Sequence, residues 1–191
     1  MQSASDRIVL LARQAEPIFH SGDLARLWDV HNSNTLYTLL KRYTKKGLLF
    51  RIYKGLYSLL PLEKLDPLLL GIKAIHGYAY ISTETILVRE GFIMQIQHQY
   101  TLVSAFSRSF RIGPYTFKSR QLQEKYLYNP AGIIEKNGVL KATPERALAD
   151  LFYFNPKVYL DSIHTIDMKK FQALQKEIGY PFTPDHHADS A

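Results

Sequence analysis

The sequence predicts an α+β protein of two domains. Segments with apolar residues at helical spacing alternate with short segments of period two. The 191 residues suffice for one large or two small domains. Residues 1–60 contain nine Lys and Arg against four Asp and Glu, a net charge of +5, whereas residues 61–191 contain fifteen against thirteen, a net of +2. We therefore expect a basic domain over 1–61, an α+β domain with a mixed or antiparallel sheet over 62–179, and a disordered tail over 180–191.

The first domain has the pattern of three helices followed by a hairpin. Helical spacing covers residues 4–15, 22–29 and 33–46. Ser5 and Ser21 are the expected N-caps of the first two helices, and Gly47 ends the third. The segments "LLFRIY" and "LYSLL" then read as short strands around Lys54-Gly55. This order is typical of a winged helix-turn-helix domain, in which the third helix reads DNA and the hairpin forms the wing.

The third helix has two faces when each residue advances by about 100°. Its core face carries Leu36, Leu39, Leu40 and Tyr43. Its opposite face carries Asn34, Tyr37, Thr38, Lys41 and Lys45, with Arg42 on the flank. Packing in the core therefore explains the leucines, but it does not explain the residues of the polar face.

A recognition helix places polar side chains near its N-terminus to reach base edges and Lys or Arg farther along to contact phosphates. Asn34 can pair with adenine, and Thr38 can contact a thymine methyl group. The predicted DNA-binding residues are Asn34, Tyr37, Thr38, Lys41, Arg42, Lys45, Lys46, Arg51 and Lys54. Tyr37 equally fits a residue packed at the rim, and an exposed basic helix is often only solvated. The succession of helix, turn, basic helix and basic hairpin favours nucleic-acid contact.

The second domain mixes helices and strands. "DPLLLGIKAIHG" reads as a helix with Pro67 at its start, and "YAYISTETILVREGF" as a strand and a helix capped at Ser82. Strands are expected at "QYTLVSAF", "SFRIG", "YTFKSR" and "KYLY", and a hairpin turns at Asn137-Gly138. "TPERALADLFYF" reads as a helix capped by Thr143, and a last helix covers residues 165–177. The expected order is that of an α+β domain.

The sequence offers little for catalysis. Without cysteine there is no disulfide, thiolate zinc site or cysteine nucleophile, and no Gly-rich phosphate loop, HExxH or GxSxG motif occurs. The seven histidines are scattered, and no close carboxylate pair suits a magnesium ion. Arg146 and Asp150 are one helical turn apart and are expected to pair. We therefore predict no enzymatic activity, no cofactor and no metal, with a nucleic-acid-processing enzyme as the weakest alternative.

The chain has no apolar run near the roughly 18 residues that a membrane-spanning helix needs, and no signal-peptide pattern. A cytoplasmic protein without a membrane partner is expected.

Three segments resemble the AbiEi-type antitoxins of toxin–antitoxin systems. They are "GDLARLWDVHNSNTLYTLLKRYTKKGLLFRIYKGLYSL", "YISTETILVREGFI" and "ATPERALADLFYFNP", and they follow the family's order and spacing from about Asp6 to Pro156. In the second segment, Thr85-Ile86-Leu87 and Glu90-Gly91-Phe92 stand where the family usually has Ser-Ala-Leu and His-Gly-Leu. The third segment also reads simply as a well-capped core helix.

The resemblance implies a repressor that binds repeats in its own promoter and also acts as the antitoxin of a nucleotidyltransferase-like toxin. It implies neutralisation either by direct binding or only functionally. Its DNA-reading roles would fall on Asn34, Thr38, Lys41, Arg42 and Lys45, with Arg51 and Lys54 in the wing. A homodimer on a repeated double-stranded DNA site is the expected arrangement, because one small domain reads few base pairs. The alternative is a plain transcription regulator whose second domain binds a ligand or dimerises.

Overall fold

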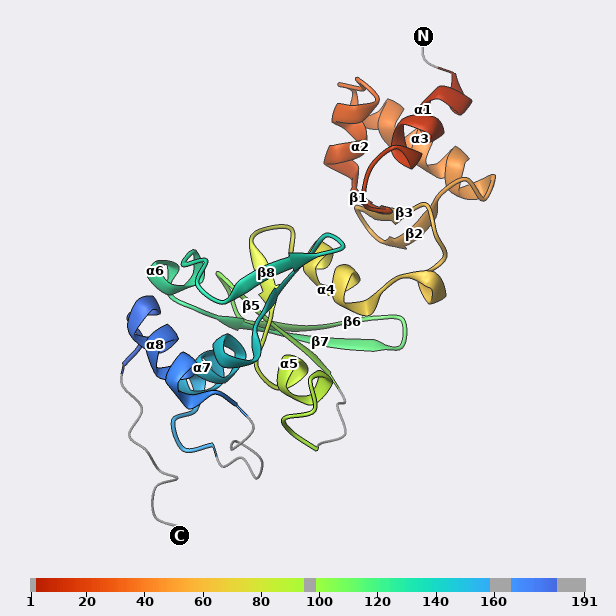
Figure 1. Cartoon of the computed structure of the whole chain (residues 1–191). Coiled ribbons are helices and arrows are strands. Elements are labelled where there is room, and N and C mark those ends of the chain that lie inside the picture. Colours follow the sequence, from red (N-terminus) through yellow and green to blue (C-terminus); the bar gives the residue numbers. More distant parts are fainter. Residues whose placement is uncertain (1–2, 95–98, 159–165, 182–191) are drawn as a thin grey trace. The chain divides into compact units, whose positions relative to one another are not determined.

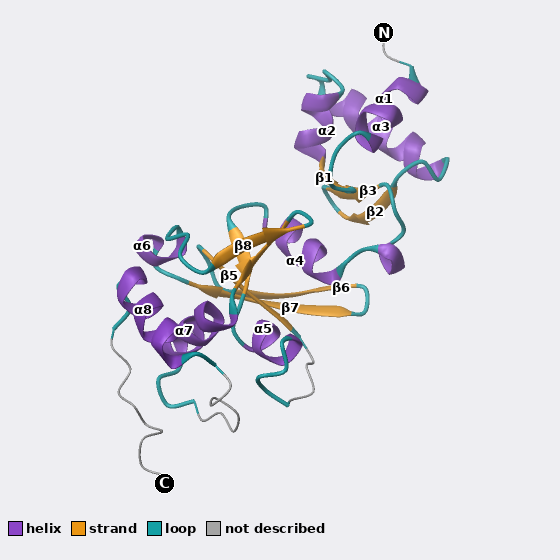
Figure 2. Ribbon diagram, viewed as in Figure 1, coloured by secondary structure: helices purple, strands orange, loops and turns teal. Residues whose placement is uncertain are grey.

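The structure is a computed structural model that describes residues 3–94, 99–158 and 166–181. The chain forms two compact units: Met1–Gly77 with Arg111–Tyr115, and Tyr78–Phe110 with Thr116–Ala191. Figure 1 traces the elements along the chain, and Figure 2 distinguishes the helices from the strands. Both units combine helices with a sheet, so the predicted α+β class is confirmed.

Three helices open the first unit, and the N-caps of the first two differ from the expectation, whereas the third begins at Ser33 as expected. They are α1 (Ala4–Ala12), α2 (Ser21–Leu27) and α3 (Ser33–Lys45). The N-cap of α1 is Ser3 rather than Ser5, because the Ser3 hydroxyl accepts from the Asp6 amide while the Asp6 carboxylate accepts from the Ser3 amide. Ser21 is the first residue of α2 and not its cap. Asn32 caps α3 by accepting from the Thr35 amide.

A three-stranded antiparallel sheet completes the fold of these helices. It has the order β1-β3-β2, from β1 (Ile18–His20), β2 (Phe50–Tyr53) and β3 (Leu56–Ser58). The β2–β3 hairpin agrees with the expectation, and Gly55 at its turn has a φ of +90°. We did not expect β1, since three residues directly before a helix are too few to show period two.

The helices pack around Trp28 and Tyr43. Both side chains are buried, and their ring centroids lie 5.4 Å apart in an edge-to-face arrangement. The Trp28 indole nitrogen donates to the Arg7 carbonyl at 3.3 Å and so ties α1 to the end of α2. Leu36, Leu39, Leu40 and Tyr43 are buried, which confirms the predicted core face of α3.

The first unit extends beyond Pro61, where we placed the domain boundary, and continues to Gly77. It includes the 3₁₀ helix η1 (Leu62–Lys64) and α4 (Pro67–Ile75), which begins at Pro67 as expected. Lys73 of α4 forms an ion pair with Glu16, and its carbonyl accepts from His20 Nε2 at 2.7 Å. The observed boundary differs from the predicted one because these contacts join residues that are distant in sequence. Neither hydrophobic periodicity nor composition indicates such contacts.

The second unit contains a mixed sheet of order β6-β7-β5-β4-β9-β8, except for the tip of the β6–β7 hairpin, Arg111–Tyr115, which belongs to the first unit. Its strands are β4 (Ala79–Ile81), β5 (Tyr100–Ser104), β6 (Arg108–Ile112), β7 (Tyr115–Gln121), β8 (Ile133–Lys136) and β9 (Val139–Ala142). Strand β4 is antiparallel to β5 and parallel to β9, and β5 is parallel to β7. The β8–β9 hairpin turns at Asn137 and Gly138, both at positive φ, as "NG" predicts.

Among its described residues, this unit has four helices: α5 (Glu84–Arg89), α6 (Glu124–Leu127), α7 (Pro144–Phe154) and α8 (Met168–Ile178). Helices α7 and α8 lie side by side in Figure 1, with Phe152 and Phe171 edge to face. The helix over "TPERALADLFYF" and its Thr143 cap are confirmed.

The strand predicted at "KYLY" is a helix, because Tyr126 and Leu127 are neighbours that are both buried, which a half-exposed strand does not allow. Thr83, not Ser82, precedes α5. The predicted disordered tail begins too early: Tyr180 is only 7% exposed and donates to Asp150, while residues 182–191 lie outside the described residues. The expected start of the last helix at 165 also lies outside them.

Candidate nucleic-acid interface

Helix α3 and the β2–β3 hairpin together line a groove of about 980 Å³. Its lining residues are Tyr37, Lys41, Thr44, Lys45, Arg51, Lys54, Gly55 and Tyr57. We call this surface the α3–hairpin groove. It forms because α3 buries its leucine face, so that its polar face turns outward next to the hairpin.

The cations of the groove are not neutralised locally. Within the described ranges, no carboxylate oxygen lies within 4.0 Å of the charged nitrogens of Lys41, Lys45, Arg51 or Lys54. Five acids of the first unit have partners elsewhere, in caps or ion pairs: Asp6, Glu16, Asp23, Asp29 and Asp66. Four unpaired positive charges around one concave surface give it a positive potential, which attracts an anion.

Two tyrosines line the groove in different ways. Tyr57 is buried on β3 opposite Arg51 of β2, and burial raises the pKa of its hydroxyl, so Tyr57 is a neutral part of the wall. Tyr37 is 54% exposed, so it lines the groove from an outward position rather than from the core. An exposed aromatic side chain beside four cations is able to stack or donate a hydrogen bond to a ligand.

Two threonines of α3 bind their own helix. The Thr38 hydroxyl donates to the Asn34 carbonyl at 2.8 Å, and the Thr44 hydroxyl donates to the Leu40 carbonyl at 2.8 Å. With the hydroxyl proton donated inside the helix, Thr38 has its methyl group and an oxygen lone pair to offer to a partner. The Thr38 methyl group, rather than its hydroxyl proton, is therefore the group available for the predicted contact with a thymine methyl group.

The structure brings together five of the nine predicted residues: Tyr37, Lys41, Lys45, Arg51 and Lys54. Asn34 and Thr38 are exposed on α3 outside the groove, and Lys46 is the exposed C-cap residue. Arg42 lies on the other flank of α3, with its guanidinium carbon 5.5 Å from the Tyr43 ring centroid. We did not expect Thr44 and Tyr57. The hairpin register pairs Tyr57 with Arg51, and this pairing could have indicated Tyr57 as a groove residue.

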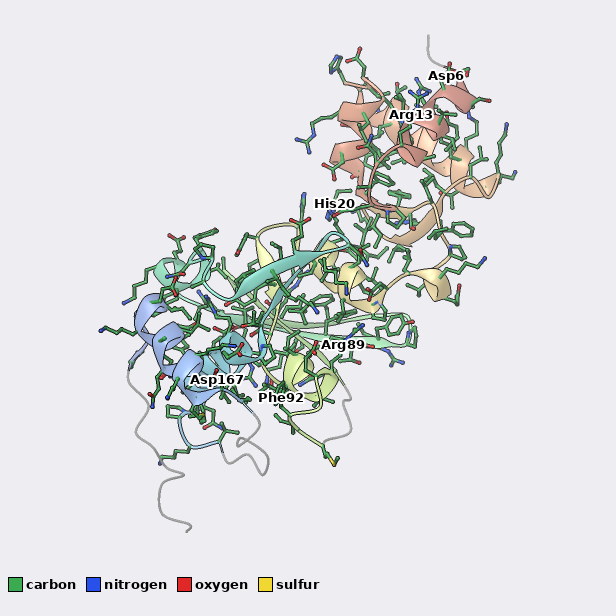
Figure 3. The ribbon with its side chains drawn as sticks, in the orientation of Figure 1. Asp6, Arg13, His20, Arg89, Phe92 and Asp167 are labelled. Carbon is green, nitrogen blue, oxygen red and sulfur yellow. The ribbon has the colours of Figure 1, made fainter. Side chains whose placement is uncertain are left out.

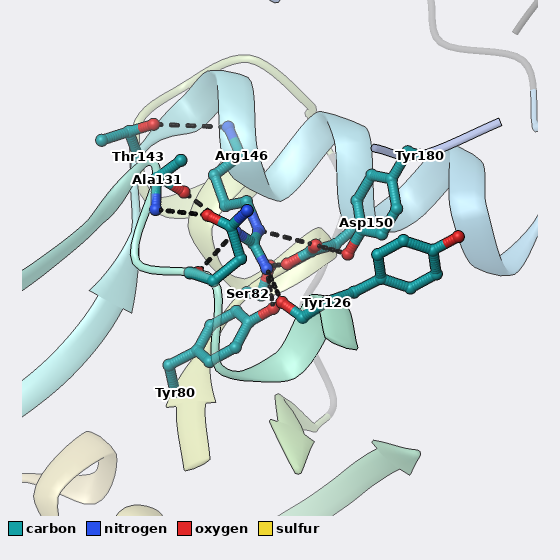
Figure 4. Close-up of polar contacts among 9 residues, drawn as sticks. Tyr80, Ser82, Tyr126, Ala131, Thr143, Arg146, Asp150 and Tyr180 are labelled. Carbon is teal, nitrogen blue, oxygen red and sulfur yellow. Dashed lines mark hydrogen bonds and ion pairs between the residues drawn. The ribbon is translucent and has the colours of Figure 1, made fainter. Parts of the chain in front are cut away.

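A second cluster of charged residues lies buried in the second unit, around Arg146 of α7 (Figure 4). All five N–H donors of its guanidinium are used. Nε donates to Asp150 at 3.0 Å, and the two terminal nitrogens donate to the Tyr80 hydroxyl and to three backbone carbonyls, those of Tyr126, Asn129 and Ala131. The network therefore joins β4, α6, the segment before β8, and α7.

Asp150 completes the network. Its carboxylate accepts from Ser82 at 2.6 Å and from the Tyr180 hydroxyl at 2.5 Å. Burial opposes the charge of Arg146, but the Asp150 carboxylate outweighs it and raises the pKa of Arg146. Burial, reinforced by Asp150, also raises the pKa of both Tyr80 and Tyr180, so both hydroxyls stay protonated. Because the Arg146 and Asp150 side chains have no exposed surface, this cluster stabilises the fold rather than contacting a partner.

Over the residues that the structure describes, no three His, Asp or Glu side chains are grouped to hold a metal ion. In the same part of the chain, no helix is both long and apolar enough to cross a bilayer. The absence of a metal site and of catalysis stays a prediction.

Comparison with known proteins yields a likeness of fold. No protein-family model matches the chain, and no curated protein matches it. Among solved structures, the crystal structure of the Rv2827c protein from Mycobacterium tuberculosis is similar, with a TM-score of 0.54 over 93% of this chain and 72% of that chain. The sequence identity is 13%, so the likeness concerns the fold alone.

Proposed function

We propose that the first unit is a winged helix-turn-helix domain that binds double-stranded DNA, with α3 in the major groove and the β2–β3 hairpin as the wing. The observation that carries the proposal is the α3–hairpin groove, in which four cations have no acidic partner among the described residues. Phosphate oxygens would supply the missing negative charge.

The polar face of α3 suits the major groove of B-DNA, which is about 12 Å wide and admits one helix. Asn34 and Thr38 are on the exposed first half of α3, where a recognition helix meets base edges. Lys41 and Lys45 follow in the second half, and Arg51 and Lys54 extend the positive surface onto the hairpin. In this arrangement Asn34 and Thr38 would contribute to sequence specificity, and the four cations would contribute to DNA affinity.

We further propose that the protein represses its own operon and acts as the antitoxin of a nucleotidyltransferase-like toxin. This part rests on the sequence resemblance. The "TPERALADL" segment of that resemblance places Arg146 and Asp150 in the buried network, so these two residues would support the antitoxin unit without touching a toxin.

The test is binding of the purified chain to labelled DNA from directly upstream of its own gene, with unrelated DNA as competitor. We compare wild type with Lys41→Glu/Lys45→Glu. The matched control is Lys169→Glu/Lys176→Glu, which changes two exposed lysines of α8 by the same charge. Specific binding that is lost in the first variant and kept in the second is expected.

Absence of wild-type binding at 50 mM salt would overturn the DNA-binding proposal. If both double variants lost DNA binding equally, the loss would be an effect of net charge alone. This result would count against α3 as the helix that reads the DNA sequence. The antitoxin part has its own test: co-expression with the neighbouring gene should relieve growth arrest, and this relief should survive Lys41→Glu/Lys45→Glu.

A further inference from the structure

A second basic hollow, of about 530 Å³, lies on the flank of α3 that does not line the α3–hairpin groove. Its lining includes two arginines, Arg7 of α1 and Arg42 of α3, together with Asn32 and Thr35. We call it the Arg7–Arg42 hollow. Arg7 was absent from the residues that we predicted to bind DNA, because it belongs to the first helix.

The two arginines have unused donors. Arg7 Nε is buried and has no hydrogen-bond partner, and no carboxylate of the described chain forms an ion pair with Arg7 or Arg42. The Tyr43 ring lies under the Arg42 guanidinium. A planar guanidinium with free donors matches the geometry of phosphate oxygens, with which it forms paired hydrogen bonds.

One acid also lines the hollow, and it does not neutralise the arginines. The Asp29 side chain is 85% exposed, and its carboxylate lies 3.2 Å from His31 Nε2. Asp6, labelled on α1 in Figure 3, is the acid next to Arg7 in sequence. Its carboxylate accepts from the Ser3 amide in the capping box instead. The arginines therefore retain their charge for a partner.

Two helices begin at this hollow. Ser3, the N-cap of α1, and Asn32, the N-cap of α3, both belong to its lining. The N-terminus of a helix carries a partial positive charge, and both helices are long enough to have one. Their fields add to those of the arginines, and the Asp6 carboxylate in the first turn of α1 offsets part of the contribution of α1.

The location of the Arg7–Arg42 hollow on α3 indicates which anion it binds. The α3–hairpin groove is lined by Tyr37 and Lys41, while the Arg7–Arg42 hollow is lined by Thr35 and Arg42, so the two surfaces flank the exposed face of α3. A helix in the major groove has a phosphate backbone on each side. We infer that, if α3 binds the major groove as proposed above, the Arg7–Arg42 hollow binds phosphates of the strand opposite the one contacted by the hairpin.

The experiment measures DNA affinity against salt for wild type and for Arg7→Gln/Arg42→Gln. Each phosphate contact contributes about 0.9 to the slope of log affinity on log salt, so loss of two contacts lowers the slope by about 1.8. Between 50 and 200 mM salt, wild-type affinity should therefore fall about tenfold more than that of the variant. The preference for the specific site over competitor DNA should stay unchanged, since phosphate contacts carry no sequence information.

Arg13→Gln/Arg26→Gln is the matched control, because it removes two exposed arginines of the same unit that lie outside the hollow. It should leave the slope within experimental error of wild type. Arg7→Lys/Arg42→Lys should restore most of the slope. The single variant Arg42→Gln, which removes an exposed side chain and does not disturb α1, should lower the slope by about 0.9.

The outcomes separate the two proposals. If Lys41→Glu/Lys45→Glu abolishes binding while the slope of Arg7→Gln/Arg42→Gln and of Arg42→Gln equals that of wild type, the α3 interface stands and the hollow is not a phosphate site. If the control variant lowers the slope as much as the hollow variant, the effect is general charge and the inference fails. If wild type binds no DNA, both proposals fail together.

Discussion

Arg146 and Asp150 face each other across one turn of α7, with Nε and Oδ1 3.0 Å apart and neither side chain exposed to solvent. A buried ion pair of this kind is tolerated because every donor of the guanidinium has an acceptor. The pair is best understood as the centre of the second unit.

Asp150→Ala should strongly destabilise the second unit. It leaves the charge of Arg146 buried without its counter-ion, which costs about 3–5 kcal/mol of the free energy of unfolding. Urea unfolding measures the change. The control Arg26→Gln breaks the ion pair with Asp23 on the surface and should cost less than about 1 kcal/mol. Equal losses in the two variants would show that Arg146 does not depend on Asp150.

Tyr180→Phe should also reduce stability, although the residue lies at the end of the described chain. Tyr180 is buried and donates to Asp150 at 2.5 Å, so the variant removes one donor from a buried carboxylate, at a cost of about 1–3 kcal/mol. Tyr128 is 57% exposed, so Tyr128→Phe is the control and should change stability by less than about 0.5 kcal/mol. Thermal unfolding of wild type and the two variants measures the changes in stability. Unchanged stability of Tyr180→Phe would contradict the prediction.

Gly132→Ala should be more harmful than Gly91→Ala. Both glycines have positive φ, +71° and +80°, where a side chain costs about 1–2 kcal/mol. Only at Gly132 would the added Cβ meet a neighbour, 2.7 Å from Cβ of Arg146, which adds about 1–3 kcal/mol of steric cost. Denaturant unfolding compares the variants, and similar losses would mean that α7 moves away freely.

His20 should make the first unit less stable in mild acid. Burial lowers the pKa of His20; the hydrogen bond to the Lys73 carbonyl opposes this, and His76, whose ring stacks on it at 3.9 Å, adds to the lowering. The unfolded chain, with a His pKa of about 6.5, then binds the proton more readily than the folded chain. The contribution of His20 is complete above this value and is lost as pH falls through the lower pKa of the folded state.

The measurement for His20 is the free energy of unfolding from pH 5 to 8 for wild type and His20→Gln, in which the amide is able to replace the ring as donor to Lys73. The difference between the two proteins should increase with pH and become constant above about pH 7. Parallel curves would show that His20 does not contribute to the pH dependence.

The amino-acid sequence by itself determined the elements whose signals are local. The leucine face of α3, the Asn137-Gly138 turn and the cap of α7 at Thr143 depend on residues within a turn or two of one another, and each was predicted correctly. The uneven charge along the chain was likewise a property of the sequence alone. These features depend on backbone geometry and side-chain type, which neighbours in the chain already specify.

Only the tertiary structure decided which of these residues meet. It placed Arg51 and Lys54 beside Lys41 and Lys45, and it turned Arg42 away from them. It also buried Arg146 and Asp150, which the sequence showed merely as an i,i+4 pair on a helix. The physical reason is that helical spacing shows which side chains share a face, whereas the neighbour of that face is chosen by packing between segments that lie far apart in the chain.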